Sequence, residues 1–255
     1  MASVPSSSTE IDTQTVSFWD TIFSQGATCP YAQVQMPAPD DAKLLRAHRH
    51  FGDVSGKTVL DIGCGSGAAS LFFAQHGAQV MSLDVSAVAI DNLAQYCERN
   101  DIRNVTPIQM PAQEIASLGP VDFVFGAMIL HHIEPFADFA QTLRQTLVPG
   151  GKAFFWENNA SSTLMLWCRE HLTGRFGVPK HGDAEEHPLS PDEVRTLAEH
   201  LTVEVEYPEL LYFRMCSTYF LGGRFEAPFK ALDDFFYRYP RFRERSYRQY
   251  LLCTR

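Results

Sequence analysis

The sequence predicts an α/β protein with a doubly wound, mostly parallel sheet, and three features of residues 57–158 carry this prediction. Short apolar runs alternate there with amphipathic segments of helical period. The apolar runs are nearly continuous, as in strands whose two faces are both covered by helices. The first run leads through a glycine-rich turn directly into a helical segment, which is how the first strand of such a sheet ends.

Five strands and three helices are expected in this region. The strands fall at 58–62, 79–85, 105–110, 121–127 and 152–157. Helices are expected at 68–76, at 87–100 behind the cap residue Ser86, and in the segment that Pro135 opens as a first-turn proline. Pro149-Gly150-Gly151 ends the third helix.

The flanking regions divide the chain into four expected parts. Residues 1–15 are Ser/Thr-rich and are expected to be a mobile tail, and 16–51 form an N-terminal helical cap. Residues 52–158 form the core, and 159–255 supply closing strands with an inserted helical lid. This last part is expected to contain helices at 161–176 and from the capping box at Ser190 to about residue 200, and strands at 203–207 and 250–254.

Composition narrows the class of protein. The 255 residues include 21 Lys and Arg against 30 Asp and Glu, a net charge of −9, which argues against a dedicated nucleic-acid binder. No apolar run approaches the roughly 18 residues that a membrane span needs, and the N-terminus lacks the pattern of a secretory signal. Six cysteines without a CxxC pair are typical of reduced thiols, so a cytoplasmic location is expected.

The strongest local signal is Asp61-Ile62-Gly63-Cys64-Gly65-Ser66-Gly67, between a predicted strand and a predicted helix. Its glycines permit a sharp turn and a close approach of a ligand to the backbone, and the helix N-terminus suits an anionic group. Asp84 ends the next strand, where a carboxylate accepts hydrogen bonds from ribose hydroxyls. The two features together predict a crevice for a nucleoside.

Three nucleoside ligands are compatible with a strand, a glycine turn and a helix in this order. A nicotinamide dinucleotide prefers its third glycine one residue later, and a P-loop needs a Lys-Ser/Thr pair with a different spacing. S-adenosylmethionine is the third ligand, and these spacings leave it as the candidate.

The same loop resembles the D-x-G-C-G-x-G motif of class I S-adenosylmethionine-dependent methyltransferases. The resemblance continues through Asp84, through 121–123 followed by Leu130-His131-His132-Ile133, and through Leu147-Val148-Pro149-Gly150-Gly151-Lys152, so that it covers about residues 55–158. The last two motifs are similar to the branch that includes quinone-biosynthesis and small-metabolite enzymes. The resemblance implies a seven-stranded, Rossmann-like sheet whose last strand is antiparallel, and S-adenosylmethionine as cofactor.

The resemblance also implies roles for single residues. The 63–67 backbone would line the methionine portion of the cofactor, Asp61 would orient this loop, Asp84 would bind the ribose, and Ala127 would border the methyl group. Adenine would contact Val85, the Ala112 amide and either Gln113 or Glu114. The implied cofactor-binding residues are Asp61, Gly63, Cys64, Gly65, Gly67, Asp84, Val85, Ala112, Gln113 and Ala127.

Methyl transfer mainly requires an in-line acceptor and exclusion of water, with a base where the acceptor loses a proton. His131 is the first candidate for this base and Glu157 the second, while His132 is placed with the substrate or lid residues. For either histidine, a purely structural hydrogen bond at a strand end is the alternative. Trp19 and Tyr31 are expected to close over the cofactor mouth, although Trp19 fits equally well beneath the first helix.

The polar loop His181, Asp183, Glu185, Glu186 and His187 has no recognised metal-ligand spacing, so no metal is expected. Residues 212–255 carry nine basic and four acidic groups and 13 of the 31 aromatics. They are consistent with a self-packed lid, an acceptor pocket for an aromatic or lipid-like metabolite, or transient contact with a membrane surface.

Three functions remain open at this point. The first is a methyltransferase that acts on a small molecule at oxygen, nitrogen or carbon. The second is a protein of this fold that binds S-adenosylmethionine without methylating, as a cyclase, sensor or scaffold. The third is a macromolecule methyltransferase.

Overall fold

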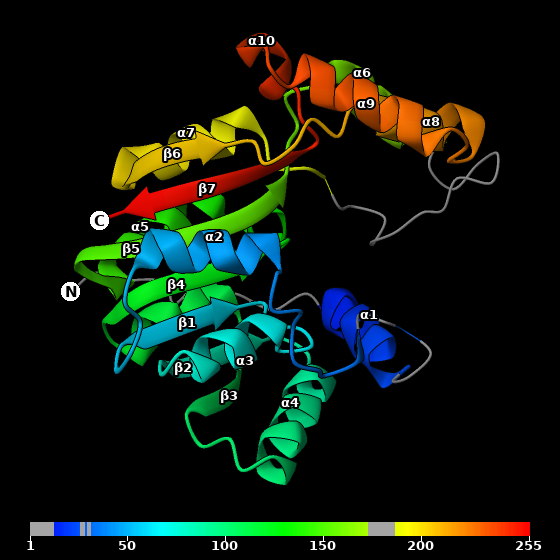
Figure 1. The fold of residues 1–255 in the computed structure, drawn as a ribbon. Helices are drawn as coiled ribbons and strands as arrows, with labels where there is room; N and C mark the ends of the chain where they lie inside the picture. Colours follow the sequence, from blue (N-terminus) through cyan, green and yellow to red (C-terminus); the bar gives the residue numbers. More distant parts are fainter. Residues whose placement is uncertain (1–12, 26–28, 30–31, 173–186) are drawn as a thin grey trace.

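The computed structural model describes residues 13–25, 29, 32–172 and 187–255, and its centre is a seven-stranded sheet (Figure 1). The strand order is β3-β2-β1-β4-β5-β7-β6. Strands β1 to β5 pair in parallel, and β7 is antiparallel to both of its neighbours, β5 and β6. The predicted sheet with an antiparallel last strand is therefore confirmed.

The strand bounds agree with those expected to within one or two residues, with one exception. The strands are β1 Thr58–Ile62, β2 Gln79–Asp84, β3 Val105–Gln109, β4 Val121–Ala127, β5 Leu147–Asn158, β6 Thr202–Glu206 and β7 Arg248–Thr254. β5 begins five residues before the expected 152, because Leu147 already pairs with Val121 of β4. The register then shifts, and regular pairing resumes at Phe123 and Lys152. Pro149-Gly150-Gly151 thus lies inside a bulged strand.

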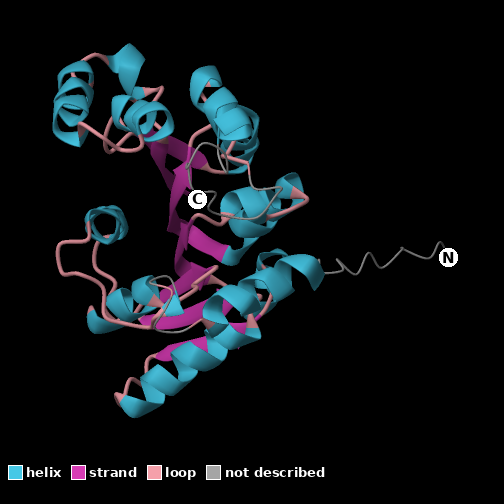
Figure 2. Cartoon of the chain, turned by 90° about the vertical axis from the view of Figure 1, so that its right-hand side faces the viewer, coloured by secondary structure: helices cyan, strands magenta, loops and turns pink. Residues whose placement is uncertain are grey.

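Helices cover both faces of this sheet (Figure 2). One core cluster joins Leu44 and Phe51 of α2 and Phe73 of α3 to Phe125 and Phe154 of the sheet, and a second joins α5 and α7 to the opposite face. The helices are α1 Thr13–Ser24, α2 Ala42–Phe51, α3 Ala68–Gln75, α4 Ala87–Arg99, α5 Phe136–Thr146, α6 Thr163–Leu172, α7 Pro191–His200, α8 Phe213–Leu221, α9 Glu226–Phe236 and α10 Pro240–Arg243, with the 3-10 turns η3 Ala112–Leu118 and η4 Leu130–His132.

Two predicted helix caps are present. The Ser86 side chain accepts the Ala89 amide at 3.2 Å, and Ser190 and Glu193 form a reciprocal capping box at the start of α7. These caps satisfy backbone donors that the first turn of a helix leaves without partners.

Three details of the helices differ from expectation. Pro135 is the N-cap of α5, one position before the expected first turn, since its extended backbone (ψ 127°) lies outside the helix. α1 begins at Thr13, inside the segment expected to be a tail. α6 begins at Thr163, two residues after the expected start, and its expected end at 176 lies outside the described residues.

Helices α6, α8, α9 and α10 form a separate helical group beyond the end of β5 and the start of β7 (Figure 1). Met165, Cys168, Tyr219 and Tyr247 make a small core of their own there. This group occupies the place of the expected lid. No helix within the described ranges is both long enough and apolar enough to cross a bilayer.

Candidate functional site

A cavity of about 550 Å³ opens at the carboxyl ends of β1, β2 and β4. This size is ordinary for a small-molecule site, and the carboxyl edge of a doubly wound sheet is where ligands of such folds bind. Its walls come from α1, α2, the glycine loop, the ends of β2 and β4, and the turns η3 and η4. The cavity therefore lies where the sequence places the crevice.

The glycine loop forms one wall of the cavity. Gly63 and Gly65 line it with left-handed backbones, φ +65° and +50°. A Cβ added at Gly63 would lie 2.7 Å from Ile129 Cδ1, and one at Gly65 would lie 3.3 Å from Phe23 Cζ. Both positions need glycine for the turn and for the close packing of the neighbouring walls.

Two further loop residues were expected to contact the ligand. Cys64 lines the cavity and is buried, and burial raises the pKa of its thiol, so that it stays protonated. Gly67 is not among the lining residues. It is the left-handed N-cap of α3 and lies against Leu93, so it shapes the end of the loop.

Asp84 lies at the end of β2 with its carboxylate fixed by backbone amides. Its Oδ2 accepts the Gly65 amide at 2.9 Å, and its Oδ1 accepts the Ser86 amide at 2.9 Å. The carboxylate thereby joins the glycine loop to the start of α4 while lining the cavity. Burial raises its pKa, and the two amide bonds oppose this shift.

Asp61 is the second buried carboxylate in the cavity wall. Its Oδ2 accepts the Ser70 hydroxyl at 2.5 Å, and Ser70 in turn accepts the Ser82 hydroxyl at 2.7 Å. Burial raises the pKa of Asp61 to about 7 in spite of the Ser70 bond. Asp61 and Asp84 are two buried acids that line the same cavity. They favour a ligand that carries hydroxyl donors and positive charge.

The cavity wall also contains residues expected around adenine. Val85, Ala112 and Gln113 all line it, and Glu114 is exposed outside it. The Gln113 amide donates to the Glu134 carbonyl at 2.9 Å, which fixes the direction of this side chain. Of the two alternatives, Gln113 is the residue that the structure brings to the cavity.

The end of β4 supplies the opposite wall. Ala127 lines the cavity, followed by Met128, Ile129 and His132. Met128 is a non-glycine residue with φ +57°, a conformation that costs about 1 kcal/mol and that the surrounding structure must hold. The Met128 amide donates to the Trp156 carbonyl at 2.8 Å, which helps to hold it.

His131 and Glu157 lie behind this wall and are not among the cavity-lining residues. They form a buried pair, with 2.7 Å between His131 Nδ1 and Glu157 Oε2. Glu157 Oε1 also accepts the Ile129 and Leu130 amides at 2.8 and 2.7 Å. Glu157 thus points away from the expected crevice edge, because it shares a sheet face with Phe155, opposite Trp156.

Among the expected lid residues, Trp19 lines the cavity and meets the His132 ring edge-on, with 5.9 Å between ring centroids. Its ring also stacks on Phe23, one turn further along α1, with 6.0 Å between ring centroids, and it packs against the small cluster of Phe23, Ala32 and Ala89. Tyr31 lies outside the described residues.

Sequence reasoning missed Lys43, the cationic side chain among the described residues that line the cavity. Its ammonium bonds Asp41, the N-cap of α2, at 2.5 Å and lies 5.3 Å from the centroid of the Trp156 ring. No local motif marks it, since α2 precedes the sheet in the chain and reaches the crevice through packing alone.

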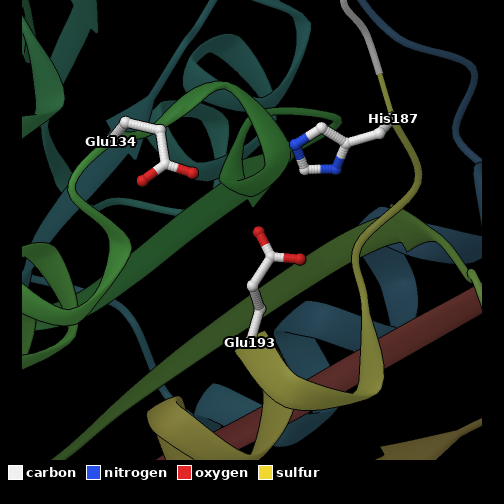
Figure 3. Close-up of side chains that lie close together, drawn as sticks. All are labelled: Glu134, His187 and Glu193. Atoms are coloured by element: carbon white, nitrogen blue, oxygen red, sulfur yellow. The ribbon is translucent and has the colours of Figure 1, made fainter.

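Glu134, His187 and Glu193 gather with their potential ligand atoms within 4.8 Å of one another (Figure 3). Both carboxylates already serve helix starts: Glu134 accepts the Phe136 amide at 3.1 Å, and Glu193 accepts the Ser190 amide at 2.7 Å. Helix N-termini favour carboxylates, so these caps account for the grouping. His181, Asp183, Glu185 and Glu186 lie outside the described residues.

Comparison with known proteins agrees with this geometry. Residues 59–151 match the family model of a methyltransferase domain. Over these residues, which are 93 of the 255, the chain is similar to a methyltransferase domain, in agreement with the motifs of its glycine loop. Among curated relatives, the ubiquinone biosynthesis O-methyltransferase of Acinetobacter baylyi is 30% identical over 121 residues, which are 47% of this chain and 51% of the relative. The chain thus spans about half the length of this relative.

Solved structures of methyltransferases and of a cyclase share the fold. The N-methyltransferase NodS from Bradyrhizobium japonicum, in complex with S-adenosyl-L-homocysteine, has a TM-score of 0.56 and 20% identity over 75% of this chain and 89% of its own. The [4+2]-cyclase SpnF has a TM-score of 0.58 and 15% identity over 94% of both chains. At these identities the likeness concerns the fold.

Proposed function

We propose that this protein transfers a methyl group from S-adenosylmethionine to a small aromatic or lipid-like acceptor. The observation that carries the proposal is the pairing of Asp84 with the Gly65 amide in the wall of a cavity of about 550 Å³. This pairing places a buried carboxylate and a glycine-walled groove side by side. The resemblance to ubiquinone O-methyltransferases supports a small acceptor of quinone-like chemistry.

The cavity residues fit the cofactor's groups one by one. Asp84 retains acceptor capacity for the ribose hydroxyls beyond its two amide bonds. Asp61, whose Oδ2 accepts the Ser70 hydroxyl, retains acceptor capacity that suits the ammonium group of the methionine portion. The ammonium of Lys43 suits its carboxylate. Val85, Ala112 and Gln113 remain the proposed adenine contacts.

The bound cofactor supplies an already activated methyl carbon, whose bond to sulfur breaks as its bond to the acceptor forms. The protein then has to align the acceptor and exclude water. Phe23 of α1 lies against Gly65 and Trp19 lines the same cavity, and we assign this exclusion to both. Where the acceptor is a hydroxyl, its proton has to pass to a base.

His132 is the histidine that faces the cavity, and it is the residue we assign to receive that proton. The His131 ring lies against it, with 4.2 Å between ring centroids, and Glu157 orients His131 from behind. His131 and Glu157 were both expected as candidates for the base. We propose that they act as positioning residues instead. They hold η4 and the end of β4 against the cavity.

The exposed side chains of the helical group support the proposal that the acceptor is lipid-like and is taken from a membrane surface. Eight of the ten exposed large hydrophobic side chains in the described ranges lie on it: Leu164, Trp167, Phe220, Leu221, Phe225, Leu232, Phe235 and Tyr239. Arg224, Arg238 and Arg241 are exposed beside them. We propose transient contact of this surface with an anionic lipid surface.

Two further expectations remain proposals. All six cysteines are free thiols, which supports a cytoplasmic location. The net charge of −9 supports an acceptor other than nucleic acid.

A non-methylating function of the same fold is the second candidate, because the cyclase SpnF shares the architecture. Methyl-labelled S-adenosylmethionine, incubated with the protein and an extract of its source cells, separates the two. Methyl transfer predicts one small labelled species by mass spectrometry, which is absent with the Asp84→Asn variant. Tight cofactor binding without any labelled species would favour the second candidate, and label in macromolecules would overturn the small-molecule acceptor.

A further inference from the structure

We propose that the protein binds a phosphate monoester in a second cavity, between α2, the end of β6, β7 and the ends of α9 and α10. This cavity has a volume of about 530 Å³. It is lined by three arginines and three tyrosines, Arg46, Arg49, Arg243, Tyr207, Tyr237 and Tyr250. α2 contributes to both cavities, but within the described residues they share no lining side chain, so this inference is independent of the function proposed above.

One face of α2 brings two of the arginines to this cavity. Ala42, Arg46 and Arg49 follow one another at intervals of four and three residues, so they form a single stripe along the helix. All three line the second cavity, while Leu44 of the same helix is buried in the core cluster on the sheet. The packing of α2 therefore sets the direction of the two guanidinium groups.

An ion pair connects this stripe to the edge of the sheet. Arg46 donates through Nε and Nη2 to the two carboxylate oxygens of Glu206, the last residue of β6, at 2.7 and 2.6 Å. Glu206 is the acid among the described lining residues, and Arg46 neutralises it. Arg46 thus serves to build the wall of the cavity and leaves the binding of an anion to the other two arginines.

Arg49 and Arg243 account for a net charge of +2 in the cavity wall. Arg49 is exposed, and Arg243 donates through Nε to the Tyr237 carbonyl and lies over the Tyr237 ring, with 4.7 Å from its guanidinium carbon to the ring centroid. In the part of the chain that the structure describes, neither arginine forms an ion pair with a carboxylate. An anion in the cavity would supply the missing partner.

The acids around the cavity do not cancel this charge. Three of them act on Tyr250, and each forms an ion pair with a base: Asp41 with Lys43, Glu206 with Arg46, and Glu209 with Arg214. Glu204 and Glu244 are exposed and lie outside the lining residues. A positive cavity in a chain of net charge −9 is a selective feature, because most of the surface repels an anion.

The tyrosines add a rigid frame and a hydroxyl donor. The Tyr237 hydroxyl donates to the Tyr207 carbonyl at 2.6 Å, which joins the end of α9 to the segment after β6. Tyr250 is the buried tyrosine in this wall, and burial raises the pKa of its hydroxyl to about 12. The hydroxyl therefore stays protonated and is a donor for an anion.

The charge and the number of donors define the ligand. A phosphate monoester carries about −1.5 to −2 charges at pH 7 and has three acceptor oxygens. It matches two guanidinium groups and a hydroxyl, whereas a single negative charge would leave one guanidinium without a partner. The same group occurs on soluble metabolites and on the headgroup of phosphatidic acid, and the cavity recognises the chemistry that they share.

The test is calorimetric titration of the cofactor-free protein with phenyl phosphate and with phenyl sulfate, a singly charged probe of similar shape. The variants are Arg49→Gln and Arg243→Gln. The matched control is Arg245→Gln, which removes the same charge from an exposed residue that lines neither cavity. Lys43→Gln reports on binding in the cofactor cavity instead. Circular dichroism and thermal unfolding show whether each variant is folded.

We expect wild type, Arg245→Gln and Lys43→Gln to bind phenyl phosphate about tenfold or more tightly than phenyl sulfate. Arg49→Gln and Arg243→Gln should each lower the phosphate affinity about tenfold, the lower end of what a charge-assisted hydrogen bond contributes. No binding of phenyl phosphate, equal affinities for the two probes in wild type, or unchanged affinity in both arginine variants would overturn the inference. A loss confined to Lys43→Gln would also overturn it, because the phosphate would then occupy the cofactor cavity.

Vesicles that contain phosphatidic acid identify the source of the phosphate once the site is established. If they displace phenyl phosphate from wild type, the site takes a lipid headgroup, and if they do not, it takes a soluble metabolite. Because all titrations are made without cofactor, their outcome is separate from that of the experiments on methyl transfer.

Discussion

Glu157 Oε2 lies 2.7 Å from His131 Nδ1, and this buried contact holds the segment that carries the proposed base. The other oxygen of Glu157 accepts the Ile129 and Leu130 amides. One carboxylate thus fixes three groups in the turn that follows β4. The turn contains the strained Met128 and presents His132 to the cavity.

Loss of this carboxylate should destabilise the fold. For Glu157→Ala we expect a decrease of about 3 kcal/mol in the free energy of unfolding, because two backbone amides and the buried His131 lose a charged partner. Urea unfolding of the cofactor-free protein measures it. Glu206→Gln, which breaks the half-exposed pair with Arg46, should cost less than about 1 kcal/mol. Equal costs for the two variants would contradict the anchoring role of Glu157.

The pKa of Asp61, raised to about 7 from an ordinary 3.8, predicts how pH affects the cofactor-free protein. The folded state holds the proton more tightly than the unfolded chain, so stability should fall as pH rises from about 4 to about 7. Unfolding curves across this range check the direction. A rise in stability that Asp61→Asn removes would contradict the assignment.

The same group predicts a pH effect on cofactor binding. The ammonium group of S-adenosylmethionine favours the charged form of Asp61, so affinity should rise with pH through about 7 and binding should release a proton. Calorimetry in buffers of different ionisation enthalpy measures the proton. Its release should be smaller in Asp61→Asn, and an identical release in both proteins would exclude Asp61 as its source.

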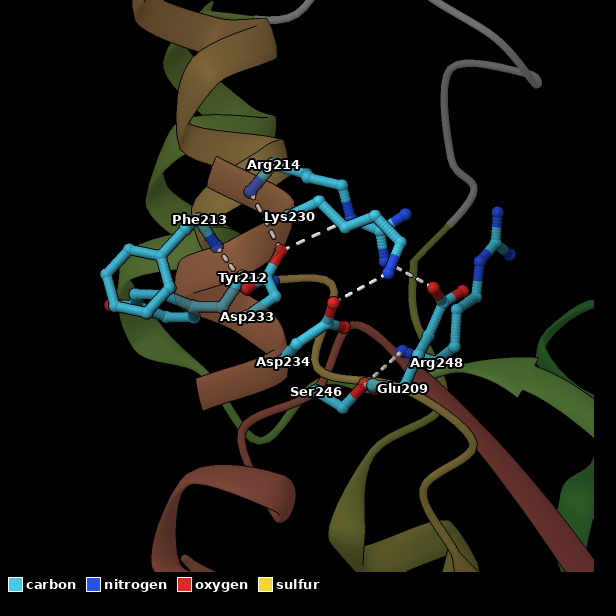
Figure 4. Close-up of polar contacts among 9 residues, drawn as sticks. All are labelled: Glu209, Tyr212, Phe213, Arg214, Lys230, Asp233, Asp234, Ser246 and Arg248. Atoms are coloured by element: carbon cyan, nitrogen blue, oxygen red, sulfur yellow. Dashed lines mark hydrogen bonds and ion pairs between the residues drawn. The ribbon is translucent and has the colours of Figure 1, made fainter. Parts of the chain in front are cut away.

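Asp233 predicts the local stability of the helical group. This buried residue of α9 accepts the Tyr212, Phe213 and Arg214 amides at 3.0, 2.8 and 3.1 Å and thereby caps α8 (Figure 4). Asp233→Ala should cost about 1–2 kcal/mol and speed hydrogen exchange in the first turn of α8. The neighbouring Asp234→Ala, which loses an exposed pair with Lys230, is the control and should leave that exchange unchanged. Equal exchange in both variants would show that the cap is unimportant.

The exposed apolar surface of the helical group predicts membrane binding. Phe225 and Phe235 are 66% and 49% exposed. Sedimentation with vesicles that contain phosphatidylglycerol should capture the wild type, and Phe225→Ser with Phe235→Ser should lower the affinity about tenfold or more. Vesicles of phosphatidylcholine alone should bind weakly because they lack charge. Equal binding to the two kinds of vesicle, or none, would contradict the proposed lipid contact.

The sequence was informative where one short segment determines both conformation and chemistry. The turn at 63–67 needs glycine at left-handed positions, and Asp84 ends a strand, so the position of the cavity was predictable. The direction of the Glu157 side chain differs from expectation, because strand alternation turns it to the face opposite Trp156. That alternation is readable from Phe155-Trp156-Glu157, although both faces of the strand are partly apolar.

Contacts between distant segments were not predictable. Lys43 reaches the cavity because Leu44 and Phe51 of its helix pack on the sheet, and Arg248 reaches Trp156 through the pairing of β5 with β7. The start of β5 was missed because glycine and proline usually end an element. Here β5 pairs with β4 at Leu147 and again from Lys152 onward, and the irregular stretch between them accommodates the proline and the glycines.

The most direct test of the account is the affinity for S-adenosylhomocysteine of wild type and Asp84→Asn, measured by calorimetry. The account predicts micromolar-range binding by wild type and a loss of at least about tenfold in the variant, because a neutral amide accepts ribose hydroxyls less strongly than a carboxylate. Asp53→Asn, at an exposed position remote from the cavity, should bind as wild type does. Equal affinities of wild type and Asp84→Asn would contradict the central claim that Asp84 grips the cofactor.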